Sequence, residues 1–217
     1  MDADAVELRV LGCLIEKQRT TPEAYPLSLN ALRLACNQST NREPVVDYDE
    51  PMIRAALDRL ARKGWSRLAS GPGSRAVKFR HLFDEALGLS GGEIALLCVL
   101  MLRGPQTPGE LKQRTQRLHN FASLDEIEQV LTALIERELV RRLPRRPGQK
   151  EQRYAHLLGD DDSEPTTPRA PAVAEADAED VDRLAEVERE LRELRDAVAA
   201  LRAELASLAD SREWSRP

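Results

Sequence analysis

Two kinds of residue in this sequence could do chemistry: dispersed histidines and cysteines, and groups of basic side chains. The three histidines lie far apart, and none has neighbours at the spacing of metal ligands. Cys13, Cys36 and Cys98 each lie in an apolar helical pattern, which predicts small buried side chains in a reducing compartment. Neither a nucleophile elbow nor a phosphate-holding glycine loop occurs in the sequence. We therefore expect a protein that is not an enzyme and holds no metal and no cofactor.

The basic side chains gather on one predicted helix and two predicted hairpins, where they could pair with phosphate groups. The first group is Arg54, Arg59, Arg62 and Lys63 on the helix that begins after Asp49, with Arg67, Arg75, Lys78 and Arg80 on the hairpin that follows. The second group is Arg141, Arg142, Arg145, Arg146, Lys150 and Arg153. Solvated faces without a ligand are an equally open interpretation of both groups.

A third candidate surface is the polar stretch from Asn37 to Pro44, which follows a short predicted helix capped by Ser28. In the functional interpretation, Gln38, Asn41 and Arg42 form a polar surface for a partner or a nucleic acid. In the structural interpretation the same groups satisfy their own backbone, with Asn37 closing the helix and Asn41 forming an Asx-turn.

The elements that must position these residues follow from the periodicity. Three helices are expected near residues 4–17, 25–38 and 49–63, followed by a hairpin at 65–69 and 76–80. In the first helix, Leu8 and its apolar partners form the buried stripe, with Glu7 and Arg9 largely off it. The order then repeats, with helices near 91–102, 109–118 and 124–137 and a hairpin at 139–143 and 152–157. Asp49 and Ser90 are predicted to cap the helices that follow them, and residues 123–126 are predicted to form a capping box. Residues 60–68 resemble residues 134–142, which supports an internal repeat. The third helix of the second copy argues against DNA contact there, since it carries Glu126, Glu128, Gln129 and Glu136.

The pattern predicts a mainly α protein with small β-hairpins (α+β), made of two tandem winged helix domains at residues 1–83 and 84–158. Residues 159–178 are expected to be an acidic flexible linker. Apolar residues then recur at alternating spacings of three and four from Leu184 to Leu208, which predicts a coiled-coil helix at 179–210 and a homodimer through it. A lone amphipathic helix that folds back on the body is the alternative.

The net charge of −5 is unevenly distributed along the 217 residues. Residues 1–83 carry 13 basic and 10 acidic side chains, residues 84–158 carry 11 and 10, and residues 159–217 carry 8 and 17. The acidic overall charge therefore does not argue against nucleic-acid binding by the front part of the chain. The N-terminus lacks the basic region of a signal peptide, and the longest apolar run, residues 94–102, is too short to span a bilayer. We expect a cytoplasmic protein without membrane contact.

Two motifs, LGCLIEKQRTTP at residues 11–22 and YPLSLNALRLACNQSTNREPV at residues 25–45, resemble the YceH-like family of bacterial proteins of unknown function. The resemblance covers residues 5–158 and implies a tandem winged helix fold. It implies no activity, and it brings no role for the polar loop residues that match the motif. The sequence therefore leaves two classes of function open. One is a helix-turn-helix, DNA-binding protein similar to a transcription regulator, and the other is a protein-interaction scaffold that does not bind DNA.

Overall fold

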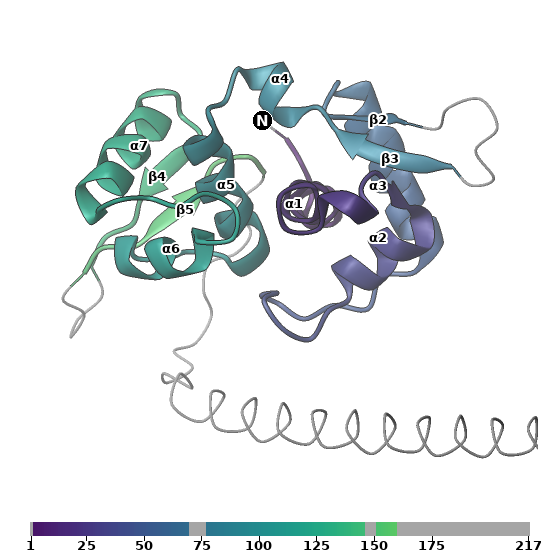
Figure 1. Ribbon diagram of the computed structural model, residues 1–217, viewed down its shortest axis with the longest axis horizontal. Helices are drawn as coiled ribbons and strands as arrows, with labels where there is room; N and C mark the ends of the chain where they lie inside the picture. Colours follow the sequence, from purple (N-terminus) through teal and green to yellow (C-terminus); the bar gives the residue numbers. More distant parts are fainter. Residues whose placement is uncertain (1, 70–76, 146–150, 160–217) are drawn as a thin grey trace, which may run out of the picture. The chain divides into compact units, whose positions relative to one another are not determined.

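Short helices and small antiparallel sheets alternate along the chain in the computed structural model, which describes residues 2–69, 77–145 and 151–159 (Figure 1). These residues belong to one compact unit, Met1–Asp162. The described part contains seven α-helices and five short strands, which confirms the predicted α+β class. The predicted coiled-coil helix, and the predicted linker beyond residue 159, lie outside the described residues.

The same order of elements occurs twice. The first half, residues 2–82, consists of α1 (Ala5–Thr20), a 3-10 turn (Pro22–Ala24), β1 (Leu27–Ser28), α2 (Leu29–Cys36), α3 (Glu50–Arg62), β2 (Ser66–Leu68) and β3 (Lys78–His81). The second half, residues 83–159, consists of α4 (Phe83–Leu87), α5 (Gly91–Arg103), α6 (Pro108–Thr115), α7 (Leu124–Glu136), β4 (Val140–Arg142) and β5 (Tyr154–His156). The first sheet has the order β1-β3-β2, and β4 pairs with β5 in the second. Gln106 bridges to Tyr154 at the place that β1 occupies in the first half.

Side-chain caps fix where most of the helices begin, and several of them are the predicted ones. Ser28, Asp49 and Ser90 each accept a backbone N–H from the first turn of the helix that follows. The predicted capping box at Ser123 is only half formed. Ser123 caps α7, but the Glu126 carboxylate accepts the N–H of Ala122 at 2.7 Å instead of that of Ser123.

The core is built around α1 and α5, which lie side by side between the two sheets (Figure 1). Both helices are buried on all sides through their middle turns, and one apolar core runs through both halves. A Cβ added at Gly12 would come within 2.8 Å of the Leu102 side chain, so glycine allows the two helices to approach closely. The predicted domain boundary at residues 83 and 84 falls inside α4, and the core continues across it.

This arrangement corrects the expectation that Glu7 and Arg9 lie off the buried face of α1. Glu7 is 2% and Arg9 4% exposed, because the α1 surface opposite the predicted stripe is also covered. The stripe was derived from the helix alone, and a helix in the centre of a fold has no solvent side. Two further elements were not predicted: β1 is only two residues long, and α4 begins without a side-chain cap. Within the described residues, none of the helices has the length and apolar character that crossing a membrane requires.

Candidate nucleic-acid and partner surfaces

The basic face predicted on α3 divides into two pairs of residues. Arg54 and Arg62 are exposed and form no ion pair among the described residues. Arg59 instead contacts Asp4 at 2.6 Å, and the Lys63 ammonium contacts Glu7 at 2.8 Å. Arg59 and Lys63, both members of the predicted site, thus fasten α3 to the start of α1, and their charges are already matched by carboxylates.

Glu7 explains why these two cations are engaged. Its carboxylate completes the capping box at the start of α1, is buried, and lies within reach of both Lys63 and Arg59. A buried carboxylate requires a charged partner, because transfer from water without one is costly. This pairing was not predicted, because Glu7 was expected to lie off the buried stripe of α1.

Three cations gather on the outer face of the first sheet, which we call the basic sheet face: Arg67, Lys78 and Arg80. Arg67 stands directly opposite Arg80 in the register of β2 and β3, and Lys78 lies two residues before Arg80 on the same side of β3. Arg80 is paired with Glu85 of α4. Arg75, which belonged to the same predicted group, lies outside the described residues.

Arg42 does not lie on a surface, and its predicted exposure is corrected. It is 4% exposed, and its guanidinium contacts both oxygens of Glu16 on α1, at 3.1 and 2.5 Å. The Nε atom donates to the carbonyl of Ala35, and Nη2 donates to the Gln38 side chain at 2.9 Å. Burial is the largest single influence and would lower the pKa of Arg42, but the hydrogen bond to Glu16 and the nearby negative charges together outweigh it, so the pKa is raised. Arg42 is thus a structural anchor, and the amide oxygen of Gln38 accepts one of its hydrogen bonds.

The rest of the loop between α2 and α3 is also tied down. Arg9 donates to the carbonyls of Cys36 and Pro44, at 3.2 and 2.7 Å. The side-chain amide of Asn37 donates to the carbonyl of Tyr48 and accepts the Tyr48 N–H. The Glu43 N–H donates to the Leu102 carbonyl of α5 at 2.8 Å. Asn41 is exposed and has a φ of 60°, so the left-handed residue is Asn41 and not the helix-closing Asn37. The structural interpretation of this loop therefore describes Asn37 and Arg42 better than the binding interpretation.

On the second hairpin the predicted cations remain at the surface. Arg141, Arg142 and Arg145 are exposed. The Arg142 guanidinium lies over the Tyr154 ring, 5.5 Å from its centroid. Arg153 is held by the carbonyl of Pro105 and the carboxylate of Glu110. Arg146 and Lys150 lie outside the described residues.

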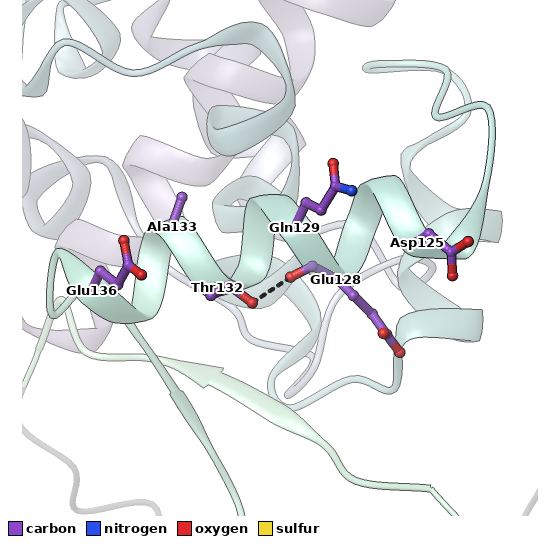
Figure 2. A pocket seen from close by; sticks show the side chains of 6 residues that line it. All are labelled: Asp125, Glu128, Gln129, Thr132, Ala133 and Glu136. Carbon is purple, nitrogen blue, oxygen red and sulfur yellow. Dashed lines mark hydrogen bonds between the residues drawn. The ribbon is translucent and has the colours of Figure 1, made fainter.

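A surface that the sequence showed only as an obstacle to DNA is the outer side of α7 (Figure 2). There a recess of about 500 Å³ is lined by Asp125, Glu128, Gln129, Thr132, Ala133 and Glu136. The Thr132 hydroxyl is occupied, because it donates to the Glu128 carbonyl at 2.7 Å. Asp125, Glu128 and Glu136 form no ion pair within the described part of the chain. The row of acidic residues was visible in the sequence, but the recess was not.

The histidines and cysteines do not form a chemical centre. All three cysteines are free and buried, as predicted. His81 is fully buried against Gln18, with Nε2 2.5 Å from the amide oxygen, and burial lowers its pKa to about 4. Burial lowers the pKa of His156 to about 4 as well. Among the described residues, no three His, Cys, Asp or Glu side chains are grouped so that they could hold a metal ion.

Comparison with known proteins extends over most of the chain. Residues 3–149 match a family model described as "Protein of unknown function, DUF480". A "UPF0502 protein" of Solibacter usitatus (strain Ellin6076) is 51% identical over 188 residues, which cover 87% of this chain and 90% of the relative. A "UPF0502 protein" of Pelobacter propionicus is 58% identical over 71% of each chain. A third, from Serratia proteamaculans (strain 568), is 47% identical over 92% of this chain and 95% of its own length.

Proposed function

Because the chain belongs to the DUF480 family of proteins of unknown function, its role must be argued from its own surfaces, and we propose that it is a non-enzymatic, DNA-binding winged helix protein. The expected membership of an uncharacterised bacterial family is confirmed. The proposal treats the two halves as tandem winged helix domains, since each has the order helix, strand or bridge, two helices and hairpin.

The observation that carries the proposal is the basic sheet face. Like charges directly opposite each other on neighbouring strands destabilise a sheet, and Arg67 and Arg80 are such a pair. Glu85 matches only part of this charge. A phosphate group placed over the face would relieve the repulsion and accept hydrogen bonds from both guanidinium groups. We therefore propose contact with the phosphate backbone, without a role in reading base sequence.

The exposed cations of α3 extend this surface in the proposal. Arg54 and Arg62 lie eight residues apart, so they share one side of the helix. The second half contributes its hairpin through Arg141, Arg142 and Arg145, but not α7, because the carboxylates of α7 would repel phosphate. Dimerisation through residues 179–210 remains a prediction, and it would double the number of such contacts.

Binding of a short mixed-sequence DNA duplex, followed by fluorescence anisotropy over a range of salt concentrations, tests the proposal. Arg54→Glu and Arg67→Glu should each weaken binding on all sequences and lower the salt slope by about 0.9 for each lost phosphate contact. Arg117→Glu makes the same charge change at an exposed residue beyond α6 and should leave binding nearly unchanged. Equal losses in all three variants, or no binding by the parent protein at physiological salt, would contradict the proposal.

A second candidate, the interaction scaffold, is favoured by a different observation. The outer side of α7 is hollowed and carries carboxylates without ion-pair partners among the described residues. Such a surface is unsuited to DNA and suited to another protein. The two functions are compatible, since the proposed DNA contacts leave out the outer side of α7.

A further inference from the structure

We propose that the outer side of α7 is a docking groove for an extended, cationic segment of a partner protein that also carries one apolar side chain. The inference is independent of DNA binding, because the proposed DNA contacts leave out α7. It begins from an unpartnered helix face. Asp125, Glu128, Thr132 and Glu136 follow one another at spacings of three, four and four residues, which places them on one side of α7 (Figure 2).

The hollow on this side continues beyond the helix face. Next to the recess of about 500 Å³ lies a second one of about 210 Å³, and both are lined by Glu128. Pro108, Leu124 and Tyr154 give the second recess apolar walls. Leu124 is 45% exposed although it is a large apolar side chain at the first position of α7. The groove therefore has an acidic length, and at its end Leu124 offers an exposed apolar contact among polar residues.

The charges decide what the groove accepts. Residues 124–136 contain four carboxylates and no basic side chain, and Asp125, Glu128 and Glu136 have no ion-pair partner in the described part of the chain. Arg145 and Glu151 both line the second recess, so they leave its balance of charge unchanged. Nucleic acid would be repelled by these carboxylates, and so would the acidic residues 159–217 of this chain. A cationic partner is the occupant that complements them.

The dimensions suit a short extended segment. From Asp125 to Glu136 the helix rises roughly 17 Å, at about 1.5 Å per residue. An extended chain covers that distance in about five residues, at about 3.3 Å each. Lysine or arginine side chains on alternate residues of such a segment would all face α7, because side chains alternate along an extended chain. An apolar side chain at the end would then reach Leu124.

The test uses a labelled peptide with lysine at every second position and a leucine at one end, and its counterpart with glutamine in place of lysine. Fluorescence anisotropy should show saturable binding of the lysine peptide and roughly tenfold weaker binding of the glutamine peptide. Glu128→Lys with Glu136→Lys should weaken binding of the lysine peptide by roughly tenfold or more. Leu124→Ser should weaken it by a smaller factor and only when the peptide carries its leucine.

The matched control is Glu23→Lys with Glu50→Lys, which makes the same change of net charge at exposed positions of the first half. Binding should be nearly unchanged in this variant. Equal losses in control and groove variants would overturn the proposal, because attraction would then follow net charge alone. The remaining possible occupant is a second copy of this chain, which sedimentation velocity tests. If Glu128→Lys with Glu136→Lys dissociates the parent oligomer and no peptide binds, the groove holds that second copy and the proposal is wrong.

Discussion

The helices α3 and α7 occupy the same position in the two halves, and comparing them separates what the fold requires from what the surface can change. Each has thirteen residues, and each is capped at its start by a side-chain oxygen, from Asp49 or Ser123. Their inward residues correspond closely: Ile53, Leu57 and Leu60 in α3, and Ile127, Leu131 and Leu134 in α7. Packing density leaves little freedom at such positions.

The outward positions of the two helices differ in the sign of their charge. Glu128 and Glu136 of α7 stand where α3 has Arg54 and Arg62. A change of charge at an exposed position usually costs little stability, so the two faces were free to diverge while the cores were not. One repeated scaffold can therefore present a face for phosphate and a face for cationic protein segments.

The largest effect is expected in the connection between α2 and α3, which Arg42 anchors in the first half. Arg42→Ala should lower the free energy of unfolding by about 3–5 kcal/mol, because Glu16 loses its partner and the loop loses three further hydrogen bonds. Chemical denaturation measures the effect. Arg33→Ala on α2 is the control, expected to change stability by less than about 0.5 kcal/mol. Unchanged stability of Arg42→Ala would show that the loop does not need its anchor.

Lowering the pH should destabilise both halves of the protein, through one histidine in each. His81 pairs with Ser66, and His156 pairs with Val140 at the equivalent place in the second sheet. Burial lowers both pKa values from 6.5 to about 4, so the unfolded chain binds more protons between these two pH values. The contribution of each neutral histidine to stability is therefore complete above pH 6.5 and declines as the pH falls towards 4. For the fully buried His81, complete loss amounts to about 3 kcal/mol.

One residue distinguishes the two histidines. Burial is the main cause that lowers the pKa of His81, and the carboxylate of Asp84, 3.4 Å from Nδ1, partly offsets it. Asp84→Asn should therefore lower the pKa of His81 further and leave that of His156 unchanged, as NMR titration of the two rings can show. A parallel shift of both rings would mean that the substitution acts through the whole fold and not through this contact.

The smallest expected effect concerns the ends of α3 and α7. Gly64 has a φ of 72°, and Glu138, at the equivalent position after α7, has a φ of 56°. Glycine adopts this conformation without the penalty that a Cβ brings. Glu138→Gly should therefore stabilise the protein by about 1 kcal/mol. Gly64→Ala should destabilise it by about 1 kcal/mol, because alanine is strained at a positive φ. A Cβ at Gly64 would meet no atom within 4 Å, so a steric clash adds nothing to this backbone effect. Thermal unfolding of both variants measures this, and stabilisation by Gly64→Ala would refute the conformational argument.

Much of the fold could be predicted because its signals are local. The caps at Ser28, Asp49 and Ser90 depend on residues within one turn of each helix. The internal repeat was visible because the buried residues of α3 and α7 recur at the same spacing. The candidate site was harder to predict. Arg54, Arg62 and the cations at 141, 142 and 145 are exposed as expected, while Arg42, Arg59 and Lys63 are engaged by the first helix and its cap.

The sequence by itself determined the α+β class, the starts of most helices, the burial of the three cysteines and the opposite charges of α3 and α7. All of these follow from side-chain type and short-range spacing. Only the tertiary structure decided which charged residues are available to a partner. Glu16 reaches Arg42, Glu7 reaches Lys63, and Arg9 donates to the carbonyls of Cys36 and Pro44. A buried carboxylate is stable only beside a cation, and the fold can bring that cation from any position in the sequence.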